Sequence, residues 1–236
     1  MNILVINPNS SEEMTRSIRA VLERIKRSDV VLDVVRTEGA PPAIQSATDA
    51  ALATPHVLKR VREANANGVD AIILACFSDP GLEAARELSD ALVLGIQETT
   101  LHIAVTLGHK YTILTPLAKR IASKERDVRR FNVEPACASV RALGMTVSET
   151  EADPKRTKER ILAVAREAIE QDGAEVLVLG CAGMVGYAAE IEEELGIVVL
   201  DPTRVAFKTA EAPVDLGVRH CKRGLYAMPA GYGARN

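Results

Sequence analysis

A nine-residue segment occurs twice in the chain, and this repeat constrains the fold more than any other feature. Residues 68–76 read Gly-Val-Asp-Ala-Ile-Ile-Leu-Ala-Cys, and residues 173–181 read Gly-Ala-Glu-Val-Leu-Val-Leu-Gly-Cys. At an offset of 105 residues, the difference between positions 173 and 68, Gly falls on Gly, an acid on an acid, and Cys76 on Cys181. Each copy is typical of a helix-ending glycine followed by a short buried strand that stops at a cysteine.

The repeat continues on both sides of the cysteines. Residues 91–94 fall on residues 196–199 without a gap, and Thr115-Pro116 follows an apolar run as Asn7-Pro8 does. Apolar strands alternate with helical segments throughout, which indicates parallel sheets covered on both faces. We therefore expect an α/β fold of two pseudo-symmetric parallel-sheet halves, with residues 1–97 plus 204–236 in the first half and residues 98–203 in the second.

Local signals predict where individual helices begin and end. Ser10 or Ser11 is a natural N-cap for a helix that reaches Arg27. A short helix is expected over Thr48–Ala53, with Pro55 opening a separate helix that ends at Asn67. Asp153-Pro154 should open a helix to Asp172, and Met184–Leu195 should form another. The stretch Arg219–Asn236 is rich in glycine and polar residues, so we expect part of it to be loose.

Composition excludes several classes of protein. The net charge is −3, aromatic residues make up 3% of the chain and Trp is absent, so nucleic acid is a poor partner. No apolar run approaches the ~18 residues of a membrane span, and the N-terminus does not read as a signal peptide, so we expect a cytoplasmic protein without membrane partners. The four cysteines include no Cys-x-x-Cys spacing, and no histidine flanks Cys76 or Cys181, so no metal site is expected.

The setting of Cys76 and Cys181 suits acid/base chemistry. A cysteine between a strand end and a helix N-terminus lies among unpaired backbone N–H groups, which favour the thiolate. Parallel sheets bind ligands beyond the carboxyl ends of their strands, so two facing halves would bring both thiols to one cleft. One thiolate could then remove a proton from a carbon acid, ~3–3.5 Å away, while the opposite thiol returns another. The alternative interpretation is that both cysteines are small packed apolar residues.

Three motifs carry a family resemblance. Asn7-Pro8-Asn9-Ser10, the run from Ala75 to Leu82 and the run from Leu179 to Met184 resemble the hydantoin racemases of the aspartate/glutamate racemase superfamily. The resemblance implies an active site in the cleft between two α/β halves, a homo-oligomer, and cofactor-independent racemisation by the cysteine pair. By matching motif, Asn9, Ser78, Ala182 and Gly183 are expected to hold the substrate beside catalytic Cys76 and Cys181. Thr115 joins them because it corresponds to Asn7 in the repeat.

The strand-end loops favour a neutral cyclic substrate. A 5-substituted hydantoin has an acidic C5–H beside a carbonyl and lacks the charges of a free amino acid, and the expected substrate-holding residues are also neutral. Interconversion of D- and L-5-substituted hydantoins is therefore the expected reaction. Allantoin racemase and a non-catalytic small-ligand-binding relative remain the alternatives; maleate isomerase and arylmalonate decarboxylase are more distant ones. Asp79 is expected to cap a helix, and Glu98 is as well placed for the surface as for the site.

Overall fold

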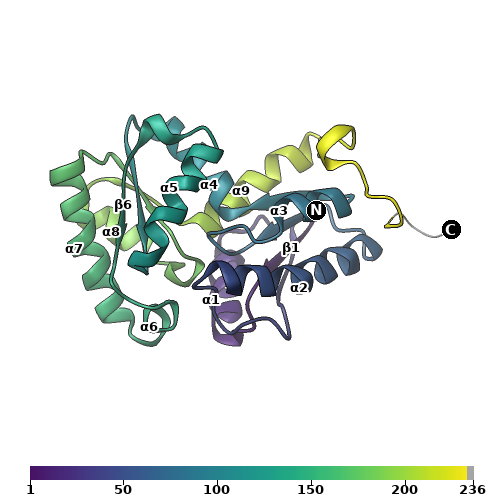
Figure 1. Cartoon of the computed structure of the whole chain (residues 1–236), viewed down its shortest axis with the longest axis horizontal. Helices are drawn as coiled ribbons and strands as arrows, with labels where there is room; N and C mark the ends of the chain where they lie inside the picture. The colour runs from purple at the N-terminus through teal and green to yellow at the C-terminus, as the bar shows by residue number, and fades with distance from the viewer. Residues whose placement is uncertain (233–236) are drawn as a thin grey trace. The chain divides into compact units, whose positions relative to one another are not determined.

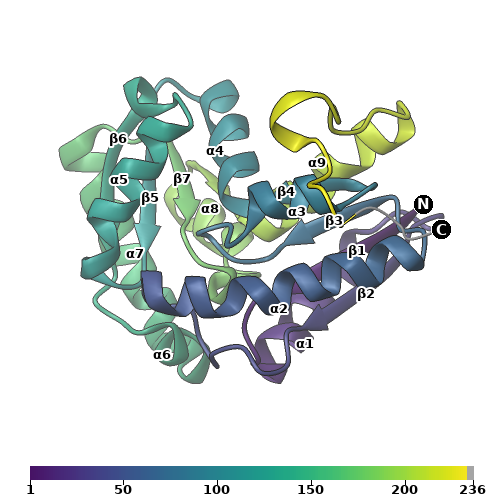
Figure 2. The same ribbon diagram turned by 45° about the vertical axis from the view of Figure 1, so that its right-hand side comes forward.

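The computed structural model describes residues 1–232, and the chain divides into two compact units. Unit 1 contains Met1–Ile96 together with the described part of the chain from Ala206 onward, and unit 2 contains Gln97–Val205. The strands and helices of each unit can be followed along the colour gradient in Figures 1 and 2. Unit 2 is thus an insertion into the chain of unit 1.

Unit 1 contains one parallel sheet with the strand order β2-β1-β3-β4. The chain runs from strand to helix to strand, which is why every strand pairs in parallel with its neighbour. Its elements are β1 (Asn2–Asn7), α1 (Glu12–Ile25), β2 (Val31–Arg36), α2 (Ala47–Ala66), β3 (Ala71–Leu74), α3 (Leu82–Leu88), β4 (Leu92–Gly95), the end of α9 (Pro202–Asp215) and η4 (Gly224–Tyr226).

Unit 2 contains a second parallel sheet with the order β6-β5-β7-β8. The fold class expected from the sequence, two parallel-sheet α/β halves, is confirmed. The elements of this part of the chain are α4 (Ile96–Leu107), β5 (Tyr111–Thr115), η1 (Ala118–Arg120), α5 (Ile121–Arg130), η2 (Glu134–Ala136), β6 (Cys137–Ala142), α6 (Val147–Ala152), α7 (Pro154–Asp172), β7 (Val176–Leu179), η3 (Ala182–Met184), α8 (Ala188–Leu195) and β8 (Val198–Leu200).

The two sheets share one register at the strands that lead to the cysteines. Ile6 of β1 pairs with Leu74 of β3, and the Ala75 N–H donates to the Ile6 carbonyl at 2.8 Å. In unit 2, Leu114 of β5 pairs with Leu179 of β7, and the Gly180 N–H donates to the Leu114 carbonyl at 2.7 Å. Cys76 and Cys181 therefore each follow the equivalent hydrogen bond of the equivalent strand pair.

The two strands that precede the cysteines, β3 and β7, are buried along their whole length. All residues of β3 and of β7 are buried, which fits strands covered on both faces. In unit 1, Ile72 and Leu74 of β3 pack with Val57 and Val61 of α2 in one cluster. Burying an aliphatic side chain of this size stabilises a fold by about 1.5–3 kcal/mol, so these strands form a rigid base for the loops that follow them.

Several predicted boundaries are confirmed and two are wrong. Ser11 is the N-cap of α1, accepting from the Met14 N–H, and α7 begins after Asp153 as expected. Residues 47–66 form one continuous helix with Pro55 inside it, whereas two helices were predicted. Pro55 removes one backbone hydrogen bond, but the buried face on both sides of it keeps the helix intact. Likewise, α8 begins at Ala188 rather than Met184, because η3 follows Cys181 first.

The stretch after α9 is better anchored than expected. The Val93 N–H donates to His220 Nε2 at 2.8 Å, Lys222 Nζ donates to the Arg86 carbonyl at 2.6 Å, and Arg86 Nη1 donates to the Tyr226 hydroxyl at 3.2 Å. These contacts hold the described C-terminal segment against α3 and β4. Residues 233–236 of the stretch predicted to be loose lie outside the described residues.

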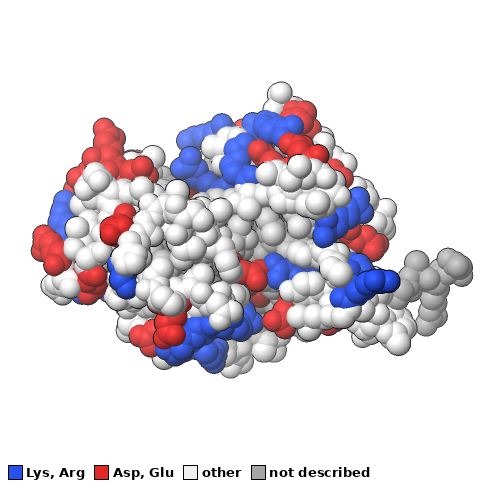
Figure 3. Space-filling view, turned by 90° about the horizontal axis from the view of Figure 1, so that it is seen from above, with Lys and Arg blue, Asp and Glu red and all other residues white. Residues whose placement is uncertain are grey.

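Within residues 1–232, no helix has the length and apolarity needed to cross a bilayer. Acidic and basic side chains both occur on the face drawn in Figure 3.

Candidate active site

The Cys76 loop, residues 75–81, begins with a tight turn. The N–H groups of Ser78 and Asp79 both donate to the Cys76 carbonyl, at 2.8 and 2.9 Å. This turn brings Cys76 Sγ and Ser78 Oγ to 3.3 Å, a hydrogen bond in which either atom can donate. Cys76 is half-buried. The hydroxyl of Ser78 can therefore contact the sulfur in both its thiol and its thiolate state.

Asp79 is not the N-cap residue of the helix that follows it. Helix α3 begins at Leu82, and its N-cap is Gly81, with no side-chain hydrogen bond at the cap. Asp79 has a φ of 44°, in the left-handed region, and is only 5% exposed. Its carboxyl group lies against Gly95, the last residue of β4, where an added Cβ would come within 2.2 Å of Asp79 Cγ. Glycine at position 95 thus makes room for the carboxyl group of the Cys76 loop.

Asn9 lies in the loop that follows β1, and its side chain is turned into the protein. Its Oδ1 accepts from Asn7 Nδ2 at 2.8 Å and from the Ser11 N–H at 2.9 Å, and its Nδ2 contacts Met14 Sδ at 3.2 Å. The Thr37 N–H donates to the Asn9 carbonyl at 3.1 Å. These bonds fix the shape of the loop beside the end of β3.

The Cys181 loop, residues 180–187, leads into a short 3-10 turn. Cys181 is half-buried and is the N-cap residue of η3, and its Sγ accepts a hydrogen bond from the Gly183 N–H at 3.3 Å. A hydrogen bond donated to sulfur favours the thiolate over the thiol. Only glycine fits at position 180, because an added Cβ would come within 2.7 Å of the Leu114 carbonyl oxygen.

Asp201, a residue the sequence prediction missed, connects the Cys181 loop to the end of β8. Its Oδ2 accepts from the Gly186 N–H at 3.0 Å, while its Oδ1 accepts from the N–H groups of Thr203 and Arg204 at 3.0 and 3.3 Å. Only 3% of Asp201 is exposed, and this burial raises its pKa, whereas the three N–H groups act in the opposite direction. The pair Asp201-Pro202 carries the sequence signal of a helix cap but no signal of the contact to Gly186.

The structure thus gathers the predicted site residues into one set in each unit. In unit 1, Cys76 and Ser78 lie in the loop after β3, and Asn9 lies in the loop after its neighbour β1. In unit 2, Thr115 is the buried last residue of β5, beside β7 and its Cys181 loop with Ala182 and Gly183. Both sets lie at the carboxyl edge of a parallel sheet, where α/β folds bind ligands.

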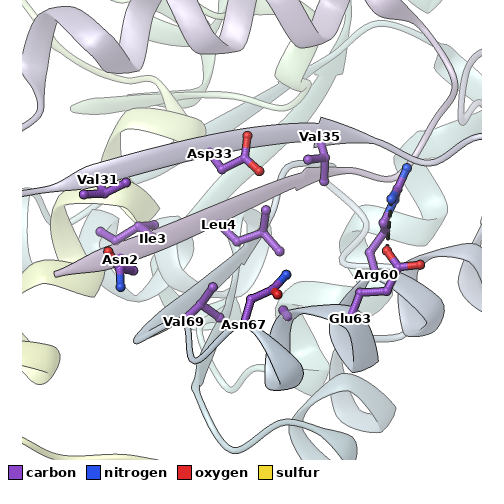
Figure 4. A pocket seen from close by; sticks show the side chains of 11 residues that line it. Asn2, Ile3, Leu4, Val31, Asp33, Val35, Arg60, Glu63, Asn67 and Val69 are labelled. Carbon is purple, nitrogen blue, oxygen red and sulfur yellow. Dashed lines mark hydrogen bonds and ion pairs between the residues drawn. The ribbon is translucent and has the colours of Figure 1, made fainter.

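A pocket elsewhere in unit 1 contains neither cysteine loop. It has a volume of about 290 Å³ and is lined by residues of β1, β2 and α2 (Figure 4). Its charged residues have partners: Arg60 pairs with Glu63 at 2.9 Å, and Asp33 with Arg19 at 3.1 Å. Within residues 1–232, no group of three or more His, Cys, Asp or Glu is placed so that it could hold a metal ion.

Comparisons with known proteins identify the family of this chain. The family model described as Asp/Glu/Hydantoin racemase matches residues 3–210. A hydantoin racemase from Paenarthrobacter aurescens is 35% identical over 230 residues, which cover 97% of this chain and 98% of that protein.

Solved structures agree with this match. The structure of an allantoin racemase from Klebsiella pneumoniae superposes with a TM-score of 0.95 at 31% identity, covering 98% of this chain and 94% of its own. That of an allantoin racemase from Pseudomonas fluorescens does so with a TM-score of 0.93 at 33% identity, covering 98% and 97%. These relatives support the expected class of enzyme, an isomerase of the racemase type, and the chain belongs to the Asp/Glu/hydantoin racemase family.

Proposed function

We propose that this protein interconverts the D and L forms of 5-substituted hydantoins without a cofactor, with Cys76 and Cys181 as the acid/base pair at C5. One observation carries the proposal: each unit places a half-buried cysteine at the same register position, with a hydrogen-bonding group at 3.3 Å from its sulfur. The curated relatives that are 34–35% identical are hydantoin racemases, and they support the same substrate class.

The proton transfer proceeds in two balanced steps. One thiolate takes the C5 proton, and the electron pair of the C–H bond moves into the ring to form an enolate on the neighbouring carbonyl. The opposite thiol then gives its proton to the other face of C5, so that the enolate returns to a carbonyl. The product is the mirror-image hydantoin, and the two sulfurs have exchanged protonation states. The enzyme is therefore ready for the reverse reaction without any redox or metal step.

The surroundings of each sulfur support this assignment. In the Cys76 loop, Ser78 Oγ can donate to a thiolate or accept from a thiol, so it stabilises Cys76 in both halves of the cycle. In the Cys181 loop, the Gly183 N–H stabilises the thiolate that takes the proton. The coupling of the two sulfurs through one substrate makes any observed pKa a property of the pair.

We also propose that Asn9, Ser78, Thr115, Ala182 and Gly183 hold the substrate. Ala182 and Gly183 have little or no side chain, which lets a planar imide ring approach the backbone closely. Thr115 is the last residue of the central strand β5, and Asn9 lies in the loop that follows the central strand β1. Assembly as a homo-oligomer, proposed from the family resemblance, is checked by light scattering on the purified protein.

Allantoin is the second candidate substrate, because it is itself a 5-ureidohydantoin. The two allantoin racemase structures with TM-scores of 0.95 and 0.93 favour it. The reacting carbon and its carbonyl are the same in both substrates, so the candidates differ only in the group that the site must accept at C5.

Polarimetry on a panel of single enantiomers tests the proposal. The panel contains 5-benzyl-, 5-isopropyl- and 5-methylthioethyl-hydantoin, allantoin, and free aspartate and glutamate, each with a blank for spontaneous racemisation. We expect loss of optical rotation with the alkyl- and aryl-hydantoins. A rate on allantoin alone assigns the second candidate. No rate on any compound overturns the proposal and leaves a non-catalytic ligand-binding protein.

A further inference from the structure

The buried carboxyl group of Asp201 is not explained by helix capping alone. Its Oδ1 already accepts from both N–H groups at the start of α9, and serine or asparagine would cap the helix equally well. A buried carboxylate instead loses much of its hydration, at a considerable cost in free energy. What the carboxylate adds is a second acceptor oxygen, Oδ2, which accepts from the Gly186 N–H of the Cys181 loop.

A short series of hydrogen bonds connects Val185, the residue before Gly186, with the sulfur of Cys181. The Val185 N–H donates to the Ala182 carbonyl and the Met184 N–H to the Cys181 carbonyl, both at 3.1 Å. Inside this turn, the Gly183 N–H donates to Cys181 Sγ. Gly186 follows with a φ of 95°, in the left-handed region, so the chain changes direction where Asp201 holds it. Fixing Gly186 therefore fixes the end of the turn that places an N–H on the sulfur.

We propose that Asp201 is a positioning residue for Cys181: by holding Gly186, it keeps the η3 turn closed and the Gly183 N–H directed at the thiolate. Asp201 acts through Cys181 and contacts no reacting atom. The kinetic consequence of this inference rests on the proposed racemase function, whereas its consequence for the reactivity of the Cys181 thiol does not.

Two variants separate the contact to Gly186 from the helix cap. Asp201→Asn keeps the size of the side chain but turns an amide donor toward the Gly186 N–H. Asp201→Ser keeps an N-cap oxygen for α9 but is too short to reach Gly186. The matched control is Asp153→Asn, the same chemical change at an N-cap of unit 2 that accepts from the Arg156 N–H and lies outside the Cys181 loop. Thermal unfolding identifies the variants that fold. One folded Asp201 variant is enough for the two measurements that follow.

The first measurement is exchange of the C5 proton for deuterium, followed separately for the D and the L hydantoin. We expect racemisation by the Asp201 variants to fall about 10- to 100-fold, as for a reacting group displaced by up to ~1 Å. In the Asp201 variants, the exchange rate should fall only for the enantiomer whose exchange is also lost in Cys181→Ser. The exchange rate of the other enantiomer should stay within about twofold of wild type. In Asp153→Asn, the exchange rates of both enantiomers should stay within that range. Equal losses for both enantiomers, or no loss, overturn the inference.

The second measurement needs no substrate. Alkylation of Cys76 and Cys181 by iodoacetamide is followed by mass spectrometry as a function of pH. We expect the apparent pKa of Cys181 to rise in both Asp201 variants, because the N–H bond that favours its thiolate is loosened, while that of Cys76 stays constant. Removal of a nearby negative charge would by itself lower the pKa of Cys181. A fall or no change therefore overturns the inference, even if the wild-type protein racemises no hydantoin and the proposed function fails.

Discussion

The Cys76 loop and the Cys181 loop use the same strand register but secure the loop in opposite ways. In unit 1 the buried acid, Asp79, belongs to the cysteine loop and lies against Gly95 at the end of the edge strand β4. In unit 2 the buried acid, Asp201, follows the edge strand β8 and binds Gly186 of the cysteine loop. Each cysteine loop is thus connected to the end of the neighbouring edge strand by one carboxyl group, contributed from opposite sides.

This difference shows what the duplicated fold requires and what it leaves free. The strand that ends at the cysteine and its pairing with the central strand are retained in both units. A carboxyl group between the loop and the edge strand is also present in both units, but it comes from the loop in unit 1 and from the end of the edge strand in unit 2. The hydrogen bonds at the two sulfurs also include different groups: the Ser78 hydroxyl contacts Cys76 Sγ, and the Gly183 N–H donates to Cys181 Sγ. The two cysteine loops thus share a backbone framework but differ in the chemical surroundings of their sulfurs.

The largest expected effect comes from replacing either cysteine. Cys76→Ser and Cys181→Ser should each slow racemisation about 10²- to 10⁴-fold, because the reaction needs an acid and a base together. Each variant should still exchange the C5 proton of one enantiomer. The enantiomer that Cys76→Ser still exchanges should be the opposite of the one that Cys181→Ser still exchanges. Polarimetry and deuterium exchange by NMR measure the two effects.

The remaining two cysteines are the matched controls for this experiment. Cys137→Ser and Cys221→Ser, at a half-buried position on β6 and at an exposed position, should leave both rates near wild type. A Cys76 or Cys181 variant that racemises at a wild-type rate would contradict the proposal that both cysteine loops take part in the reaction.

The next effect concerns the glycines on which each loop depends. Gly180→Ala and Gly95→Ala should each lower the free energy of unfolding by about 1–3 kcal/mol, the usual cost of forcing extra atoms into a packed site. The first meets a backbone carbonyl, whereas the second meets the Asp79 side chain. Urea unfolding measures both losses.

A double variant tests the contact between Gly95 and Asp79. Because Asp79→Gly removes the obstructing carboxyl group, Gly95→Ala combined with Asp79→Gly should lose less stability than the two single variants together. Strict additivity would mean that Asp79 does not limit the residue at position 95. Gly180→Ala has no side-chain partner of this kind, so no such rescue is expected there.

A smaller expected effect is a difference between the edge strands β6 and β2 in how an ion pair on each contributes to stability at different pH values. Arg141 on β6 holds the pKa of Asp172 below its ordinary value through hydrogen bonds, and Ser139 Oγ donates to the same carboxylate. A carboxyl group whose pKa is lowered by folding stabilises the fold above its unfolded pKa of about 3.9, and this contribution disappears as the pH falls through the folded pKa. Asp172→Asn should therefore cost about 1 kcal/mol at pH 7 and progressively less as the pH falls below the unfolded pKa.

The corresponding pair in unit 1 provides the comparison. Asp33 on β2 pairs with Arg19 at 3.1 Å, but both side chains are well exposed. Water and salt screen such a pair, so Asp33→Asn should change the free energy of unfolding by less than Asp172→Asn. Urea midpoints of the two variants at pH 7 and pH 3 measure the difference. An equal loss at both pH values for Asp172→Asn would contradict the assigned role of its charge.

The sequence predicts those parts of the fold that depend on short-range patterns. Apolar runs locate β3 and β7, and Ser11 and Asp153 mark helix starts, because a cap is a contact within three residues. Pro55 misleads for the same reason: its local preference for a helix start is overridden by packing along the buried face of α2.

The site is predictable only in part, for a similar reason. A repeated strand that is followed by Cys76 or Cys181 can be recognised within nine residues, whereas the bond from the Gly186 N–H to Asp201 joins the loop after β7 to the end of β8. The contact of Asp79 with Gly95 is of the same kind. No local pattern records which loops meet at the edge of a sheet, so these buried acids become visible only once the strand order is known.

The anchored C-terminal segment has a consequence for synthesis of the chain. All four strands of the unit 1 sheet lie within the first 96 residues, so they are synthesised before unit 2. His220, which accepts from the Val93 N–H of the edge strand β4, is translated only after the whole of unit 2. A nascent chain therefore lacks this contact at the edge of β4 until unit 2 has been synthesised, and during that time the edge is open to pairing with another chain.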